Sequence, residues 1–265
     1  MIIASIVIYK HEQKDVMPTI ESLFRIKAID KIVLVDNSRD CDWANSLNDS
    51  RVDYLKSDGN YGFGFGHNLA IKKYANQCQY FLICNPDIRF EVSEFDKFLN
   101  FVKNQDEGLF LPKIVYENGE NQYGARLLPS PFDLFARRFS PKLAQVLDKR
   151  YLLKDFAMDK PIFVPYLSGC FMLFKSEVLI SLGGFDERFF MYMEDIDLSR
   201  RCASKFGNLY YPDASIVHKH EKGSAKDFKL LKAHITSSLQ YFNKWGWFFD
   251  NERTKLNHIT LKQFK

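Results

Sequence analysis

Short apolar, β-branched runs alternate with helix-type patterns through the first hundred or so residues of this 265-residue chain. Strand-type runs lie at 2–8, 31–35, 52–55, 80–84 and 108–115, and helix-type segments lie at 16–26, 43–47, 65–75 and 92–102. An unbroken apolar run of this length is typical of a strand that is buried on both faces. Because strands that alternate with helices form βαβ units, the sequence predicts an α/β fold with a largely parallel sheet and helices on both faces.

The rest of the chain is less regular. We expect a strand near 169–174, a helix at 194–205, short strands at 209–211 and 215–217, and a last helix at 227–247. Residues 118–165 contain five of the nine prolines, and also Arg137 and Arg138 among phenylalanines. We interpret this segment as an insertion with one helix near 143–153. The predicted organisation is a domain at 1–226, with the insertion as its acceptor region, and a C-terminal helical extension at 227–265.

Composition places the chain among globular proteins. Hydrophobic residues make up 46% and charged residues 26%, which excludes a disordered chain or a fibrous repeat. No apolar run is long enough for a spanning helix, and the first residues lack the basic region of a signal peptide. The five cysteines are odd in number and form no C-x-x-C pair, as expected for reduced thiols. These features predict a cytoplasmic protein.

Positive charge gathers at the C-terminal end. Residues 219–265 contain ten Lys and Arg against four Asp and Glu, a net charge of +6, whereas the whole chain carries +4. Such a tail either contacts an anionic partner, for example a membrane surface, or is a solvated helix face. A net charge of +4 without regularly interleaved aromatic and basic residues argues against a nucleic-acid partner.

Polar residues follow two of the predicted strands directly. Asp36 comes after the second strand, and Asn85-Pro86-Asp87 comes after the fourth. Ligands of open α/β sheets bind outside the carboxyl ends of the strands, so both aspartates are candidate ligand contacts. Asp87 either shares a divalent cation with substrate phosphates or caps a turn.

The segment 60–68, NYGFGFGHN, contains three alternating glycines before a predicted helix. Glycine at these positions permits positive φ or close approach of the backbone to a ligand. His67 stands where a dinucleotide-binding fingerprint requires its third glycine, so a Rossmann cofactor site is not predicted. The helix start near Phe65 either faces a phosphate or sugar or merely packs closely.

Three carboxylates, Glu194, Asp195 and Asp197, open a predicted helix behind a dense aromatic stretch. The helix macrodipole accounts for one or two of them. Apolar surroundings would raise the pKa of a third toward that of a general base. Further along, His218 and His220 lie on one side of a predicted strand end, as metal ligands or as ordinary surface or core histidines.

The order of these motifs is more specific than any one of them. In sequence they are ASIVIYKHE, LVDNS, NYGFGFGHN, LICNPD, YLSGCFMLFKSE, GGFDERFFMYMEDIDLSRR and HKHEKGS. The set resembles family 2 glycosyltransferases with the GT-A fold, in particular the bacterial rhamnosyltransferase-like branch. The resemblance runs from about residue 3 to residue 224. It implies a single Rossmann-like mixed sheet flanked by helices, with a C-terminal helical extension.

The resemblance also implies roles for residues. Asp36 looks like the aspartate that contacts the nucleotide base, and Tyr9 would line the same pocket. Asp87 looks like the last acid of the D-x-D metal site, with Asn85 at the first position. Asp195 looks like the catalytic base. The remaining implied donor-site residues are Asn60, Gly64, Asn68 and Glu194.

His218 looks like the histidine that approaches the metal or the diphosphate, and His220 fits that pattern nearly as well. The implied reaction is inverting transfer that depends on Mg²⁺ or Mn²⁺. The implied donor is dTDP-L-rhamnose, with UDP-sugars such as a galactofuranose donor left open. The implied acceptor is a glycan or a polyprenyl-diphosphate-linked sugar at the cytoplasmic face of the membrane.

We expect peripheral membrane contact, made by the basic C-terminus together with Arg137, Arg138, Trp245 and Trp247. The alternative is that both tryptophans close the core. Two other functions remain open. A nucleotidyltransferase should have a basic N-terminal triphosphate loop, and residues 9–12 contain only Lys10 and His11. A non-catalytic glycan-binding module would not need Asp87, Asp195 and His218 together.

Overall fold

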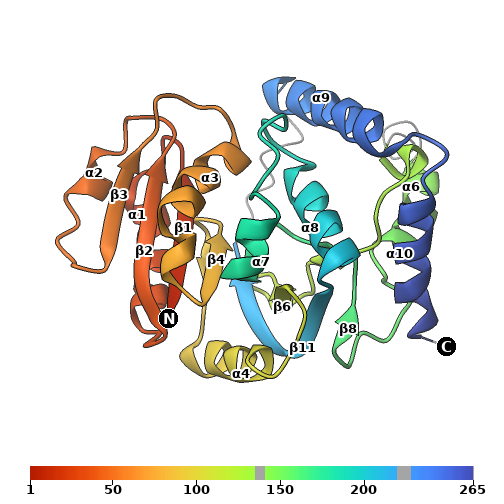
Figure 1. Cartoon of the computed structure of the whole chain (residues 1–265), viewed down its shortest axis with the longest axis horizontal. Coiled ribbons are helices and arrows are strands. Elements are labelled where there is room, and N and C mark those ends of the chain that lie inside the picture. Colours follow the sequence, from red (N-terminus) through yellow and green to blue (C-terminus); the bar gives the residue numbers. More distant parts are fainter. Residues whose placement is uncertain (135–140, 220–227, 265) are drawn as a thin grey trace.

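Nine strands form one mixed sheet within residues 1–134, 141–219 and 228–264, the part of the chain that the computed structural model describes (Figure 1). The strand order is β3-β2-β1-β4-β10-β6-β11-β5, and β8 pairs with β11. The strands are β1 (Ile2–Ile8), β2 (Ile29–Asp36), β3 (Val52–Lys56), β4 (Tyr80–Cys84), β5 (Ile88–Arg89), β6 (Leu109–Val115), β8 (Ile162–Phe163), β10 (Phe171–Lys175) and β11 (Asn208–His218). Strands β7 (Ala125–Arg126) and β9 (Tyr166–Leu167) form a separate antiparallel pair.

The first half of the sheet is parallel, as the sequence predicts. Strand β1 pairs in parallel with β2 and β4, and β2 pairs in parallel with β3. The second half is mixed, because β10 runs antiparallel between β4 and β6. All seven residues of β1 are buried, which explains its unbroken apolar run.

The helices lie mainly where the periodicity places them. They are α1 (Gln13–Phe24), α2 (Asp42–Asn45), α3 (Phe63–Tyr74), α4 (Val92–Val102), α6 (Pro141–Tyr151), α7 (Ser176–Ser181), α8 (Glu194–Lys205), α9 (Phe228–Trp245) and α10 (Asn251–Lys262). The sequence analysis missed α7, and it included 251–262 in the helical extension at 227–265 without predicting a separate helix there. It also divided β11 into two short strands, at 209–211 and 215–217. In the structure these form one strand, whose pairing with β6 shifts register between Tyr211 and Ser215.

The C-terminal helices pack on the second half of the molecule. Helix α9 runs along the upper edge of Figure 1 and α10 descends on the right. A second apolar cluster joins them to α8, and it includes Met193, Ile196, Tyr241, Phe242 and Leu256. Trp245 and Trp247 are partly buried against this cluster. The predicted domain boundary at 226/227 stays a prediction, because it falls among residues 220–227, outside the described part; Arg137, Arg138 and His220 are outside it too.

No helix in the described part of the chain combines the length and the apolar character that crossing a membrane requires. All five cysteines are free thiols.

Candidate active site

A cavity of about 600 Å³ opens where β1, β4 and β11 end. Its wall comes from the loops after β1 and β4, from the glycine-rich loop before α3, and from the end of β11. Five of the sequence-predicted site residues line it: Tyr9, Asn60, Asn85, Asp87 and His218. Others in the wall are His11, Asn37, Gly62, Phe63, Met191 and Lys219. The cavity therefore occupies the edge at which open α/β sheets bind ligands.

Asp87 and His218 meet on one side of this cavity. The Nε2 atom of His218 lies 3.2 Å from Oδ1 of Asp87 and 3.5 Å from the amide nitrogen of Asn85. Burial opposes a charge on His218, but hydrogen bonds to Asp87 and Cys170 outweigh it and raise the pKa of His218 to about 10. The imidazolium and the carboxylate thus balance each other in this arrangement.

Gln122 orients the histidine, and the sequence analysis missed it. Its Oε1 lies 2.9 Å from Nδ1 of His218, and its Nε2 donates to the backbone carbonyl of the same residue at 2.6 Å. A partner on Nδ1 holds the ring so that Nε2 points at Asp87. Gln122 lies in the segment interpreted as an insertion, and no local motif marks it.

Asp195 stands at the start of α8, and its carboxylate is held on one side. Its Oδ2 accepts hydrogen bonds from the Tyr166 hydroxyl at 3.0 Å and from the Gly169 amide at 2.9 Å. The next residue, Cys170, accepts a backbone hydrogen bond from Asn85 at 2.9 Å. The turn before β10 therefore links Asp195 to the residues around Asp87.

Glu194 differs from its neighbour, because its side chain is buried. Burial, together with the nearby Asp195, raises the pKa of Glu194 well above its usual range. The buried environment that we expected to raise the pKa of a general base therefore surrounds Glu194, which does not line the cavity.

Asp36 is fully buried at the end of β2 and does not line the cavity; the adjacent Asn37 does. The Asp36 carboxylate accepts five hydrogen bonds, from the amides of Ser38, Arg39 and Cys41 and the hydroxyls of Ser38 and Tyr54. Burial opposes its charge, but these hydrogen bonds outweigh burial and lower the pKa of Asp36. In this structure the carboxylate orders the loop after β2.

The glycine-rich loop packs against the segment before α8. Gly62 has φ +110°, its carbonyl accepts from the Asn37 amide at 2.9 Å, and the next amide, of Phe63, donates to the Phe190 carbonyl at 3.0 Å. Gly64 touches Phe185, where a Cβ would lie 2.8 Å from its side chain. Gly64 therefore serves packing, whereas Gly62 shapes the cavity.

Asn68, on α3, is also structural in this arrangement. Its buried amide donates to the Phe185 carbonyl and to Glu187, both at 2.9 Å, and its oxygen accepts from the Phe185 amide. Asn68 thus ties α3 to the segment that leads to Asp195, which makes it a support of the site rather than a wall residue.

Gly62→Ala should disrupt this loop. A Cβ there would lie 2.0 Å from the Phe190 carbonyl oxygen, in a backbone region that alanine disfavours. We expect a loss of stability above about 1–3 kcal/mol, the range for backbone strain alone, because the clash adds to it. Urea unfolding measures the loss. Gly119→Ala is the matched control, since Gly119 has φ +83° but open space around it. Equal losses in both variants would contradict the close approach.

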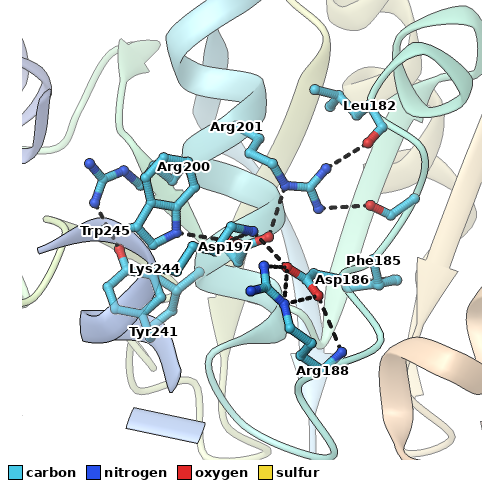
Figure 2. Close-up of polar contacts among 12 residues, drawn as sticks. Leu182, Phe185, Asp186, Arg188, Asp197, Arg200, Arg201, Tyr241, Lys244 and Trp245 are labelled. Carbon is cyan, nitrogen blue, oxygen red and sulfur yellow. Dashed lines mark hydrogen bonds and ion pairs between the residues drawn. The ribbon is translucent and has the colours of Figure 1, made fainter. Parts of the chain in front are cut away.

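A buried ionic network holds α8 to α9 (Figure 2). Asp197, the third predicted carboxylate, is fully buried and accepts from Arg201 at 2.8 Å, from Lys244 and from the indole of Trp245 at 2.8 Å. Arg201 also donates to the carbonyls of Leu182 and Gly184. Asp197 is thus an anchor of the helix that carries Asp195.

Arg200 anchors the same helix to α10. Its guanidinium is 1% exposed and donates to both oxygens of Asp250, at 2.7 and 2.6 Å, and to Glu252 at 3.0 Å. It also lies over the Trp245 ring, 4.1 Å from the centroid. Trp245 and Trp247 therefore help to close the core, which was the alternative to membrane contact in the sequence analysis.

Backbone strain precedes α8. Tyr192 and Met193 both have positive φ, 69° and 67°, a conformation that bulky residues adopt only when their surroundings enforce it. Helix α9 supplies such surroundings, because Ser237 donates to the Met191 carbonyl at 2.9 Å and His234 packs edge-on against Tyr192. The start of α8 is therefore held from both sides.

The donor set beside the cavity fits a hard divalent cation. Asp87 offers a carboxylate oxygen, the kind of ligand that Mg²⁺ and Mn²⁺ prefer. The Nε2 atom of His218, 3.2 Å from this carboxylate, could add an imidazole ligand only after it loses the proton that its raised pKa retains. Among the described residues no group of three or more His, Cys, Asp or Glu is placed to hold a metal. An ion here would thus depend on further ligands from substrate phosphates and water, as Mg²⁺ commonly does.

Comparison with known proteins decides the family. The model of glycosyl transferase family 2 matches residues 5–183. The chain belongs to glycosyl transferase family 2. The match begins in β1 and includes the loops that carry Asp36, Asp87 and Gly169, so it covers most of the cavity but ends before α8.

Two relatives of this family 2 glycosyltransferase are named as rhamnosyltransferases. Rhamnosyltransferase WbbL of Escherichia coli K12 is 26% identical over 199 residues, covering 72% of this chain and 73% of the relative. The N-acetylglucosaminyl-diphospho-decaprenol L-rhamnosyltransferase of Mycobacterium tuberculosis H37Rv is 27% identical over 204 residues, covering 71% and 65%. The match thus spans slightly less than two thirds of the mycobacterial relative.

Solved structures share the fold at low identity. GalNAc-T7, crystallised with UDP, GalNAc and Mn²⁺, superposes with a TM-score of 0.63 at 14% identity, covering 99% of this chain and 55% of that one. The mannosyltransferase PcManGT of Pyrobaculum calidifontis, in complex with GDP-Man and Mn²⁺, gives 0.62 at 15% identity, covering 97% and 68%. The mixed sheet flanked by helices is therefore a GT-A fold, as the family resemblance implies.

Proposed function

We propose that this glycosyltransferase moves L-rhamnose from dTDP-L-rhamnose to a hydroxyl of a glycan or polyprenyl-diphosphate-linked acceptor, in the synthesis of a surface polysaccharide. The names of both rhamnosyltransferase relatives support the donor sugar, and the mycobacterial name supports the lipid-linked acceptor. The observation that carries the reaction type is the linkage of Asp87, His218 and Asp195 through the turn at 168–170.

In the proposed mechanism the cavity holds the nucleotide and its diphosphate. Asp87, together with His218 once it has lost its proton, would hold the cation, and Tyr9, Asn37 and Asn60 line the remaining wall. Asp36 acts indirectly, through the loop that its five hydrogen bonds order. When bound, the divalent cation stabilises the charge that develops on the leaving diphosphate.

Asp195 then acts as the base on the acceptor. It removes the proton of the acceptor hydroxyl as that oxygen attacks the anomeric carbon from the face opposite to the diphosphate, which inverts the configuration. Tyr166 and Gly169 hold the carboxylate in place.

A UDP-sugar donor, including galactofuranose, is the second candidate, since GalNAc-T7 binds UDP within the same fold. The solved structures with this fold bind UDP or GDP-Man, so the nucleotide and the sugar of the donor need a direct test. Family membership disfavours the nucleotidyltransferase, and the complete set of Asp87, Asp195 and His218 disfavours a glycan-binding module without activity.

A calorimetric screen of dTDP, UDP and GDP, with and without Mn²⁺, tests the donor site. We expect dTDP to bind more tightly in the presence of Mn²⁺, because Asp87 and the diphosphate share the ion. Asp87→Ala should remove that gain, weakening binding about tenfold or more. Asp106→Ala, at an exposed position away from the cavity, is the control.

Tighter binding of UDP than of dTDP would mean that the donor nucleotide is UDP. Equal dTDP affinity in wild type and Asp87→Ala, at every Mn²⁺ concentration, would remove the metal role of Asp87. If no nucleotide binds the folded wild-type protein, the donor-site proposal is wrong.

A further inference from the structure

A second hollow of about 310 Å³ lies between α9 and the segment before α8. We call it the α9 hollow. Three of its wall residues are basic and none is acidic. The wall consists of Arg188, Phe190, Lys229, Lys232, Ala233, Thr236, Ser237 and Gln240.

The α9 hollow and the donor cavity share a wall. Phe190 lines the hollow, and the next residue, Met191, lines the donor cavity. This short stretch of chain therefore lies between the two spaces. Ser237 lines the hollow and donates to the Met191 carbonyl at 2.9 Å. The same segment leads, three residues later, into Glu194 and Asp195. A ligand in the hollow would therefore lie close to the start of α8.

The chemistry of the hollow suits a phosphate or diphosphate group. Arg188 is partly neutralised by Asp186, whereas Lys232 forms no ion pair within residues 1–134, 141–219 and 228–264. Hydroxyls from Thr236 and Ser237 and the amide of Gln240 add hydrogen-bonding groups. Several cationic and neutral donors around one space match the many acceptor oxygens of a phosphate.

An exposed apolar stripe runs along α9 beside these lysines. Phe228, Ile235 and Leu239 are 79%, 43% and 41% exposed, and their spacing places them on one face of the helix. Phe248 and Phe249, in the turn to α10, are exposed to 78% and 96%. A helix that presents apolar residues next to lysines is typical of one that lies in the interface of an anionic membrane.

We propose that the α9 hollow binds the diphosphate of a membrane-embedded, polyprenyl-linked acceptor, while the apolar stripe of α9 enters the bilayer interface. The inference rests on the proposed function, because it takes the acceptor to be a lipid-linked sugar. It places the acceptor sugar near the shared wall, whose chain leads into the start of α8. The basic C-terminus then contributes through two particular lysines rather than through its net charge.

Vesicle pelleting with the full chain tests the proposal. The probes are phosphatidylcholine vesicles containing undecaprenyl diphosphate, phosphatidylglycerol vesicles of equal charge density, and soluble inorganic pyrophosphate. We expect the wild type to prefer the undecaprenyl diphosphate vesicles, and Lys229→Gln/Lys232→Gln to weaken that binding roughly tenfold or more. Lys255→Gln/Lys262→Gln removes the same charge from exposed positions of α10 and should keep the preference.

Two further readouts separate the sources of binding. Ile235→Ser/Leu239→Ser should weaken vesicle binding but leave pyrophosphate binding unchanged. Equal binding to phosphatidylglycerol vesicles, or an equal effect of the α10 control, would overturn the diphosphate site in favour of general membrane attraction. A wild type that binds soluble pyrophosphate but shows no preference for the undecaprenyl diphosphate vesicles would overturn the lipid as the ligand.

Nucleotide affinity, measured on the same variants, should stay at the wild-type value, because none of these residues lines the donor cavity. A wild type that binds the lipid diphosphate but no nucleotide would refute the proposed function and leave the α9 hollow supported. A wild type that binds nucleotide but ignores the lipid diphosphate would refute only the hollow.

Discussion

Asp195→Asn should lower the turnover number by roughly 10²–10⁴-fold, the range that a positioned general base contributes. Asparagine keeps the shape of the side chain and still accepts the hydrogen bonds from Tyr166 and Gly169, so the start of α8 should stay in place. It cannot take a proton from the acceptor. Donor affinity should therefore be unchanged, since Asp195 does not line the donor cavity.

Steady-state transfer and calorimetric nucleotide binding, measured on one preparation, separate these two effects. Asp106→Asn, an exposed carboxylate away from the cavity, controls for the loss of charge. Wild-type turnover in Asp195→Asn would refute the base assignment. A loss of nucleotide binding together with turnover would instead mean that Asp195 shapes the donor site.

Asp250→Ala should cost about 3–5 kcal/mol of unfolding free energy. The change leaves the guanidinium of Arg200, 1% exposed, without its bidentate partner and with only the partly exposed Glu252 to balance it. A poorly compensated buried charge is far more costly than a lost surface pair. Asp250 also caps α10 by accepting from the Arg253 amide, which adds to the loss. Urea unfolding followed by circular dichroism measures the change.

Two comparisons sharpen this measurement. Asp96→Ala, on the exposed side of α4, should stay within about 0.5 kcal/mol of the wild type. Arg200→Met/Asp250→Ala should recover part of the loss, because it removes both charges from the interior. A cost below about 1 kcal/mol in Asp250→Ala would show that the pair does not bind α10 to α8.

Much of the donor cavity could be predicted, because the strands that end at it are marked by local patterns of apolar residues. The unbroken apolar runs of β1 and β4 specify strands buried on both faces, and parallel strands bring their carboxyl ends to one edge. Asn85, Asp87 and Tyr9 therefore line the cavity as expected. The family resemblance is confirmed, and it accounts for the mixed sheet that alternation alone did not predict.

Other residues could not be assigned from the sequence, because partners far apart in the chain decide their environment. Asp36 looks like a ligand contact after a strand, yet the amides of the following loop and Tyr54 saturate its carboxylate. Asp197 belongs to the same acidic cluster as Asp195, but Lys244 and Trp245, almost fifty residues later, make it part of the interior. Helix α10 was not predicted as a separate helix within the extension at 227–265, because buried polar contacts, more than an apolar stripe, hold it.

The sequence by itself determined the family, the parallel half of the sheet and the edge at which a donor would bind, because apolar periodicity and motif order are local properties. Tertiary structure alone decided which carboxylates face the cavity, how Gln122 orients His218, and that α9 forms a wall beside the start of α8. The physical reason is that burial and charge pairing depend on residues distant in the chain, and these set the chemistry of each side chain.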